Sequence, residues 1–358
     1  MKKMKLNKTT RSNLITYGIV IAAFAIVQIF LTAGKVSSLM EGLLVPLCVY
    51  VILAVSLNLT VGILGELSLG HAGFMCVGAF ASAFFSKCTA DVILVAGLRF
   101  FLAILIGAAV AALFGILIGI PVLRLKGDYL AIVTLAFGEI IKNLINVFFI
   151  GKDSNGFHFS MKDAASMNME ADGVTLVNGP QGITGTPNDS TFLVGIILVL
   201  ITLFIVINLV HSRDGRAIMS IRDNRIAAES IGINITKYKL MAFTISASLA
   251  GVAGVLYAHN LATLAAQPKN FGYNMSIMIL VFVVLGGIGN IRGSVIAAVL
   301  LTLLPELLRG LNDYRMLIYA VVLIVMMIFN WSPRALEWRE RYSPKRLLAK
   351  KKKTKGAE

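Results

Sequence analysis

Few side chains in this chain could do chemistry, and four of them stand close together. Glu66, Ser68, His71 and Phe74 follow one another in a glycine-dense segment, 62–74, at the start of an apolar stretch. A carboxylate at membrane depth is costly and often marks a substrate or ion path. Glycine-rich backbone at that depth is tolerated only where protein packs on it or where it lines an aqueous cavity. The segment therefore predicts a broken or re-entrant element, with these four residues as candidates for a translocation pathway.

Two plainer interpretations apply to the same segment. Small residues such as Gly70, Gly73 and Gly78 also let neighbouring helices approach closely. His71 has no second ligand at a helical spacing, which is more typical of a hydrogen-bonded buried histidine than of a metal ligand or proton relay. Packing and pathway roles are both compatible with the sequence.

Other charges within the apolar stretches are spaced so that they can pair. Glu139 and Lys142 are three residues apart, as are Glu306 and Arg309. Residues at this spacing share one face of a helix. For Glu139 and Lys142 we favour pairing, which would satisfy both charges without a role in transport, over a transport role.

No catalytic or metal-binding cluster is visible in the sequence. Cys48, Cys76 and Cys88 lie in or beside apolar stretches without metal-ligand spacing, and we expect them to be packing residues. A membrane-embedded enzyme needs a nucleophile or a metal cluster, so the sequence predicts no catalytic residue and no metal site.

Composition identifies the elements that must position these residues. Hydrophobic residues make up 57% of the 358 residues and charged residues 14%, which excludes a water-soluble surface for a chain of this length. A helix of about 20 apolar residues crosses roughly 30 Å of hydrocarbon. We therefore predict an all-α integral membrane protein with about ten transmembrane helices. The predicted crossings are 14–34, 43–62, 66–86, 92–120, 129–150, 191–210, 239–258, 274–290, 293–309 and 315–331.

The basic residues, which give a net charge of +15, predict how these crossings are oriented. Lysines and arginines flank the first and last apolar stretches, and such flanks stay on the cytoplasmic side of a bacterial cell membrane. The N-terminus, 1–13, and the tail, 332–358, are thus both predicted to be cytoplasmic on either side of a transmembrane domain, 14–331. We expect these charges to meet membrane lipid, and a nucleic-acid partner is the less favoured alternative. Three further basic groups fall on the cytoplasmic side in this topology: Arg124 with Lys126, six residues within 213–239, and Arg292.

A polar segment, 151–190, falls on the outer side in the same topology. It is too rich in Asp, Asn and Pro to cross a membrane. At this length it can fold into a small cap or form part of a docking surface, and an inert loop is the alternative.

The cytoplasmic loop 211–238 contains the most informative connection, 222–234. Asp223 is a candidate N-cap, two alanines favour helix, and Gly232 is suited to end it. The pattern predicts a short helix that seats its alanines in a groove of a partner protein, with a charged rim. The alternative is an amphipathic helix on lipid headgroups. The residues assigned to this docking helix are Arg222, Asp223, Arg225, Ala227, Ala228, Glu229 and Gly232.

A second glycine cluster, 286–293, lies between the eighth and ninth predicted crossings. It echoes 62–73 about five crossings earlier. Internal repeats build many transporters, so an internal repeat is a candidate feature of this fold.

Taken in order, these segments resemble the LivM-type permeases of branched-chain amino acid ABC importers. The resemblance covers most of 57–330 and its combination of motifs is specific. The segments that carry it are 56–59, 70–74, 127–135, 178–185, 227–233, 239–243, 250–254 and 285–289. The chain departs from the usual family pattern at 179–181, where Gly-Pro-Gln stands.

The resemblance implies a function and a set of partners. It implies that 227–232 is the coupling helix that docks on a cytoplasmic ATPase. It further implies a LivH-type sister permease, two ATPases similar to LivG and LivF, and an extracellular or periplasmic substrate-binding protein. The chain has no Gly-x-x-x-x-Gly-Lys-Ser/Thr phosphate loop, so ATP is expected on the partner subunits and no cofactor on this chain.

Three alternative functions remain open at this point. Urea and short amides are alternatives to leucine, isoleucine and valine as the transported substrate. An ion-coupled secondary transporter needs a coupling site, which the sparse intramembrane carboxylates disfavour. A membrane enzyme is disfavoured because its reactive cluster is missing.

Overall fold

The structure is a computed structural model that describes residues 8–32, 38–90, 92–125, 127–154, 156–169 and 173–331. It divides into two compact units, 1–299 and 300–358. The predicted tail, 332–358, and residues 1–7 of the predicted N-terminal segment lie outside the described residues. The described part is predominantly helical, as the composition predicts.

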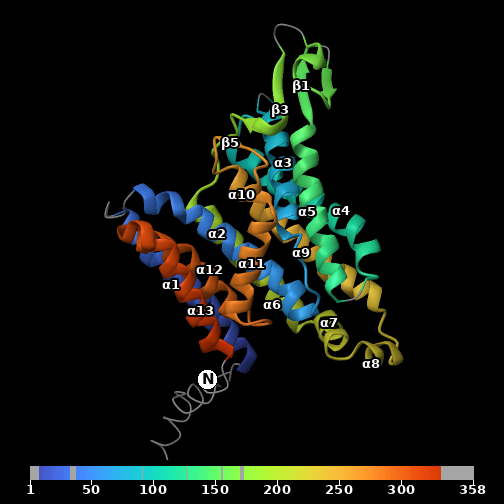
Figure 1. The fold of residues 1–358 in the computed structure, drawn as a ribbon, viewed down its shortest axis with the longest axis vertical. Helices are drawn as coiled ribbons and strands as arrows, with labels where there is room; N and C mark the ends of the chain where they lie inside the picture. The colour runs from blue at the N-terminus through green and yellow to red at the C-terminus, as the bar shows by residue number, and fades with distance from the viewer. Residues whose placement is uncertain are drawn as a thin grey trace, which may run out of the picture. The chain divides into compact units, whose positions relative to one another are not determined.

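Helices make up almost all of the first unit (Figure 1). In chain order they are α1 (Lys8–Thr32), α2 (Ser38–Asn58), η1 (Leu59–Leu64), α3 (His71–Cys88), α4 (Ala96–Val122), α5 (Asp128–Val147), α6 (Phe192–His211), α7 (Arg213–Asp223), α8 (Arg225–Ser230), α9 (Ile235–Ala258), α10 (Pro268–Phe271), α11 (Tyr273–Gly286) and α12 (Ile291–Leu307), whose end enters the second unit. The second unit continues with η4 (Leu308–Tyr314) and α13 (Arg315–Trp331).

Seven helical stretches of the described chain are long and apolar enough to cross a membrane. They are Met40–Leu64, Ala96–Val122, Asp128–Val147, Phe192–His211, Ile235–Ala258, Pro268–Gly286 and Ile291–Gly310. The other three predicted crossings fall on α1, whose apolar part Thr16–Thr32 is shorter, on α3, and on α13. The structure therefore gives a multi-pass helical protein with seven clear spans.

Two helices form the centre of the first unit. The stretch Met40–Leu64, which joins α2 to η1, and helix α9 are buried along most of their length, whereas α4 and α6 leave much of their surface exposed. Exposed apolar side chains are what lipid or a second subunit would cover. The buried helices are thus held by the chain itself.

Glycines allow α3, α4 and α9 to approach closely. A Cβ atom added to Gly78 would collide with the backbone of Gly251, and one added to Gly254 would collide with the carbonyl of Met75. Gly107 of α4 lies against Gly78 in the same layer. Small residues at these crossings are what brings membrane helices into backbone contact.

Short strands form in the polar segment between α5 and α6. β1 (Phe149–Asp153) is the middle strand of a three-stranded antiparallel sheet, between β2 (Gly156–Ser160) and β3 (Val174–Asn178). β4 (Ile183–Thr184) pairs with β5 (Thr263–Leu264) in a second small sheet. The predicted segment 151–190 therefore contains paired strands with a defined register, and its place outside the membrane stays a prediction.

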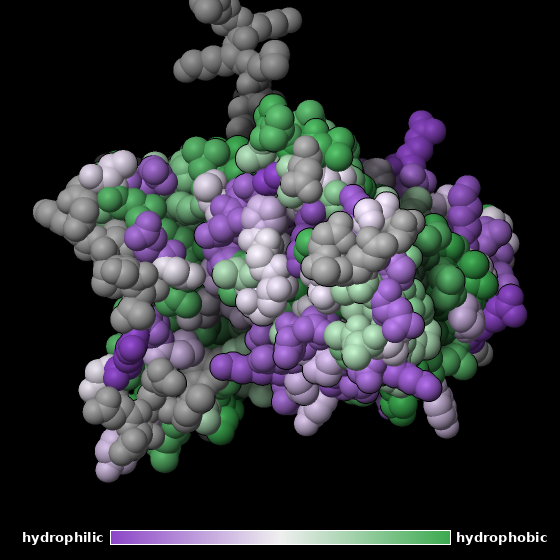
Figure 2. Space-filling view, turned by 90° about the horizontal axis from the view of Figure 1, so that it is seen from above, coloured by the Kyte–Doolittle hydropathy of each residue, from purple (hydrophilic) through white to green (hydrophobic). Residues whose placement is uncertain are grey.

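The two ends of the first unit differ in architecture. Figure 1 places β1 and β3 beyond one end of α3 and α5, and α7 and α8 at the opposite end. Seen from the sheet end, Figure 2 shows hydrophilic residues across the middle of the surface and hydrophobic residues mainly toward its sides. These two ends are called the sheet end and the α7–α8 end below.

Candidate functional site

The predicted docking helix exists as α8 at the α7–α8 end. Asn224 precedes it, and its side-chain Oδ1 accepts a hydrogen bond from the Ala227 backbone N–H at 3.1 Å. The predicted cap, Asp223, is wrong by one residue. Asp223 ends α7 and its carboxylate instead accepts hydrogen bonds from Arg222, from Nε at 3.0 Å and from Nη2 at 2.9 Å.

The two alanines of α8 face in different directions, which corrects the expectation that both seat in a partner. Ala228 is only 2% exposed and packs with Ile221 of α7 and Ile235 of α9, so this side of α8 is fastened to its own chain. Ala227 is exposed. The anchoring through Ala228 makes α7 and α8 one packed body.

The outward side of α8, with the residue that follows it, exposes apolar and charged groups. Ile226 is 80% exposed and Ile231 is 74% exposed. Arg225 and Glu229 are also exposed. Apolar side chains that project from an exposed, charged loop favour a protein interface over solvent.

Gly232 ends the helix as predicted. Its φ is +84°, a left-handed conformation that favours glycine, and its N–H donates to the Glu229 carbonyl at 3.0 Å. This turn sends the chain back toward α9.

The predicted pathway residues are mostly buried within this chain. Ser68, His71 and Phe74 are at most 2% exposed. His71 Nε2 is 2.7 Å from Ser56 Oγ, so it is a hydrogen-bonded buried histidine. The Ser68 hydroxyl has no hydrogen-bond partner among the described residues. Contact of these side chains with a substrate stays a prediction.

Glu66 is half-buried and forms an ion pair with Lys239 of α9. The two residues lie 173 positions apart, so no spacing along the chain could predict this pair. This pair fastens the non-helical segment 65–70 to α9 near the α7–α8 end.

The segment 65–70 interrupts the helical path between η1 and α3. Two backbone N–H groups near the start of α3 are satisfied by side chains of other helices. Leu69 N–H donates to Thr134 Oγ1 of α5 at 3.0 Å, and Ala72 N–H donates to Ser276 Oγ of α11 at 3.1 Å. Buried backbone needs such partners, and here protein rather than an aqueous cavity supplies them.

The pair predicted between Glu139 and Lys142 is present. Lys142 pairs with Glu139, which also accepts from the Tyr273 backbone N–H at 2.8 Å. In the second unit Arg309 pairs with Glu306 at 3.0 Å. Among the described residues no group of three or more His, Cys, Asp or Glu side chains is arranged to hold a metal ion.

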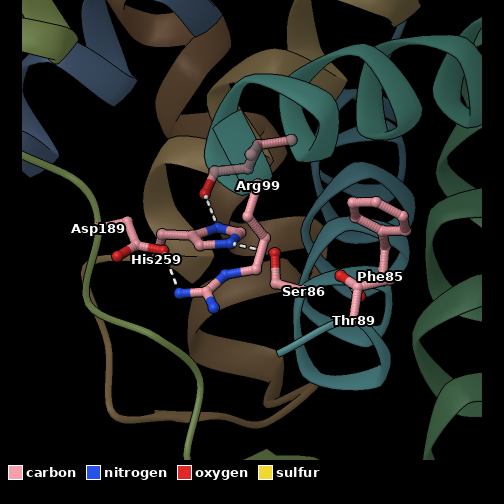
Figure 3. Close-up of polar contacts among 7 residues, drawn as sticks. Phe85, Ser86, Thr89, Arg99, Asp189 and His259 are labelled. Carbon is pink, nitrogen blue, oxygen red and sulfur yellow. Dashed lines mark hydrogen bonds and ion pairs between the residues drawn. The ribbon is translucent and has the colours of Figure 1, made fainter. Parts of the chain in front are cut away.

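The sheet end has a polar cluster that the sequence did not indicate (Figure 3). His259, fully buried after α9, donates through Nδ1 to the Val255 carbonyl at 3.0 Å, so its Nε2 accepts from the Ser86 hydroxyl at 2.8 Å. Beside it Arg99 pairs with Asp189 at 3.2 Å. Burial lowers the pKa of His259 below its ordinary value. The cluster joins α3, α4, α9 and the connection that follows β4.

Comparison with known proteins adds a decisive observation. The family described as branched-chain amino acid transport system permease component matches residues 39–329. The chain belongs to this permease family. No solved structure matches the permease.

Named relatives agree with the family match. The permease is 37% identical over 297 residues to the high-affinity branched-chain amino acid transport system permease protein LivM of Salmonella typhimurium, with 80% of this chain and 67% of the relative covered. The same figures hold for LivM of Escherichia coli K12. A more distant relative is the fructose import permease protein FruG of Bifidobacterium longum, 24% identical over 243 residues, with 66% of this chain and 68% of FruG covered.

Sequence reasoning missed two residues of the α7–α8 end. Asn224 is the N-cap of α8. Asn is a favoured N-cap residue, but Asp223 beside it is favoured as well, and Asp223 was the predicted cap. Asn58 is the last residue of α2, and its side chain is fully buried. In the sequence it is marked only as a polar residue between Leu57 and Leu59.

Proposed function

We propose that this permease is a transmembrane subunit of an ATP-driven importer that moves leucine, isoleucine and valine across the cell membrane. The match over residues 39–329, together with 37% identity to LivM over 80% of the chain, carries the proposal. The protein acts as a permease and not as an enzyme, and ATP is bound and hydrolysed by partner subunits.

The proposed topology has ten crossings with both termini in the cytoplasm. It places the α7–α8 end in the cytoplasm and the sheet end outside. Arg213, Arg216, Arg222 and Arg225 gather at the α7–α8 end, and cytoplasmic loops of membrane proteins are enriched in such residues. The same topology makes α1, α3 and α13 the three crossings beyond the seven clear spans.

In this proposal α8 docks on an ATPase. The exposed Ile226, Ala227 and Ile231 supply the apolar contact, and Arg225 and Glu229 supply the rim. Closure of the ATPases around ATP moves α8 and rocks the helices between an outward-open and an inward-open state. The further partners are a LivH-type sister permease, two LivG/LivF-type ATPases and an external binding protein, which supplies most of the substrate selectivity.

The segment 65–70 is proposed to lie beside the translocation pathway. Support comes from its interrupted helix and from the paired charge of Glu66, since unwound segments at membrane depth accompany pathways in many transporters. Ser68, His71 and Phe74 would then hold this segment in place through contacts within the chain and would not touch the substrate themselves.

Reconstitution tests the proposal. The permease, its sister permease, both ATPases and the binding protein are placed in proteoliposomes, and uptake of labelled leucine, valine, urea and acetamide is measured with and without ATP. We expect ATP-dependent uptake of the amino acids only. Uptake of urea or acetamide instead would replace the substrate class, and uptake driven by an ion gradient without the ATPases would replace the transporter class.

A further inference from the structure

Arg222 was expected to face an ATPase, but its guanidinium turns toward its own chain. Its Nη1 donates to the carbonyl of Gly62 in η1 at 3.0 Å. Gly62 is buried and lies two residues before the end of η1 at Leu64. The last carbonyls of a helix have no intrahelical donor, and a cation there also complements the helix dipole. Arg222 of α7 therefore caps the helix that begins as α2.

The surroundings of Arg222 are shaped to hold it in this position. Gly65 follows η1 with φ +83°, and a Cβ atom there would lie 2.5 Å from Arg222 Cγ. The Asp223 carboxylate binds two other nitrogens of the guanidinium. Because the guanidinium is planar, binding of its Nε and Nη2 by the Asp223 carboxylate sets the direction in which Nη1 points.

Gly62 connects this cap to a distant part of the chain. A Cβ atom on Gly62 would collide with the backbone of Gly289, in the turn between α11 and α12. Asn58 fixes that approach, because its Oδ1 accepts from Gly289 N–H at 2.9 Å and its Nδ2 donates to Ser294 Oγ at 3.0 Å. Asn58 and Ser294 are fully buried. A displacement at Gly62 must therefore reach the α11–α12 turn.

The route back to α8 is equally short. Ile221, the neighbour of Arg222, packs against Ala228 of α8, and Asn224 caps α8 two residues after Arg222. Because α7 and α8 pack together, a force on the exposed Ile226 also acts on the Arg222 guanidinium at the end of α7. The receiving element, η1, is a π-helix, a form that occurs mostly as short insertions within α-helices and often at functional sites.

From these contacts we infer that Arg222 is a positioning residue that transmits movement of α8 through Gly62 to the α11–α12 turn. The inference rests on the proposed function of α8. It assigns the partly exposed Arg222 guanidinium to contacts with its own chain, whereas Ile226, Arg225 and Glu229 remain the surface offered to the ATPase. Arg222 is thus needed for the response of the permease to the ATPase and not for binding the ATPase.

The variant Arg222→Gln tests this separation in the complete importer. We expect the ATPases to co-purify as with the wild type, and uptake per ATP hydrolysed to fall about ten-fold, within the range of ordinary coupling between sites. Stimulation of ATP hydrolysis by the loaded binding protein should be lost. Arg222→Lys keeps the charge but cannot bind Asp223 and Gly62 in the same planar geometry, so an intermediate loss is expected.

Arg216→Gln is the matched control. Arg216 lies on α7, is exposed, and its guanidinium donates to the His211 carbonyl at 3.3 Å. We expect the importer with Arg216→Gln to take up as much substrate per ATP hydrolysed as the wild type. Loss of ATPase binding in Arg222→Gln would overturn the inference, because Arg222 would then be part of the docking surface. Normal uptake by Arg222→Gln would also overturn it.

A measurement on the wild-type complex avoids dependence on variants that fail to fold. Hydrogen–deuterium exchange is followed in peptides that contain 59–66 and 286–293, with and without a non-hydrolysable ATP analogue. Both peptides should change together, and an unchanged 286–293 peptide would refute the transmission route. If the wild type itself binds no ATPase, the proposed function fails, which is a different outcome from either of these.

Discussion

Two polar clusters, His259 with Arg99–Asp189 at the sheet end and Arg222–Asp223 at the α7–α8 end, differ in how far they are buried. At the sheet end His259 is fully buried and hydrogen-bonded on both nitrogens, and the Arg99–Asp189 pair beside it is mostly buried. At the α7–α8 end the Arg222–Asp223 pair is solvated, and Ile226 is left without apolar cover within the described chain. Buried, satisfied networks fix one conformation, whereas solvated pairs contribute little stability. We therefore expect the sheet end to stay in place and, on the proposed function of α8, the α7–α8 end to move.

The largest effect is expected where the moving end meets the core. Gly62→Ala places a methyl group against the backbone of Gly289 and against Asn58. Backbone atoms cannot step aside as a flexible side chain can, so we expect a loss of about 3 kcal/mol in the free energy of unfolding. Thermal unfolding in detergent measures it.

Gly97→Ala is the control for this substitution. Gly97 lies in the first turn of α4 at the sheet end with nothing within 4 Å of an added Cβ. Alanine there should leave stability unchanged or raise it by about 0.5 kcal/mol. Equal losses in the two variants would contradict the close contact between Gly62 and Gly289.

Breaking the ion pair of the sheet end should reduce stability without affecting ATPase binding. Asp189→Asn leaves the Arg99 charge partly buried and unpaired, for an expected loss of about 2 kcal/mol. Glu306→Gln, in the more exposed pair with Arg309, is the comparison and should lose less than about 1 kcal/mol. Thermal unfolding and co-purification are both recorded, and reduced ATPase binding in Asp189→Asn would show that the two ends are not separate.

The third test places the same strain at each end. Gly232→Val and Gly185→Val both force a β-branched residue into a left-handed conformation, φ +84° and φ +72°, with open space around the new Cβ. Such strain is about 1–2 kcal/mol. At Gly232 it should distort α8 and reduce co-purification of the ATPases about ten-fold, which corresponds to about 1.4 kcal/mol.

Gly185→Val should bind the ATPases normally, since Gly185 follows β4 at the sheet end. Normal binding by Gly232→Val would place the docking surface elsewhere. Equal loss in both variants would point to general misfolding.

The smallest effect is a pH dependence of the sheet end. Because the pKa of His259 is lowered in the folded chain from an ordinary value of 6.5, the unfolded chain binds a proton first as the pH falls. Stability is therefore full above about pH 6.5 and decreases below it, by up to about 1.4 kcal/mol for each pH unit. Unfolding curves at pH 7.5 and pH 5.5 should differ less in His259→Gln than in the wild type, and an equal difference would exclude His259 as the cause.

The sequence predicted those parts of the permease that depend on local pattern. The long apolar stretches became helices because a backbone in lipid must satisfy its own hydrogen bonds. Glu139 with Lys142 was predictable from helical spacing, and Gly232 from its place after a short helix. Of the two roles left open for the glycines at 70, 73 and 78, the structure shows the packing one, because small side chains are what close helix crossings require.

Contacts between distant residues could not be predicted in the same way. Nothing in a single sequence joins Glu66 to Lys239, Arg222 to Gly62, or Ser86 to His259. Asp223 and Asn224 are equally good caps by chemistry, and only the path of the backbone after α7 decides between them. Ala228 faces inward for a reason located in Ile221 and Ile235, on other helices.

The burial of the three cysteines allows one position of the wild-type chain to be labelled selectively. Cys48 and Cys76 are buried, whereas Cys88, at the end of α3 nearest the sheet, is only half-buried. A thiol-reactive fluorophore should therefore attach selectively to Cys88 in the folded wild-type chain. The permease thus offers a labelling site at its sheet end, against which motion of a second label on α8 can be measured without first removing its native thiols.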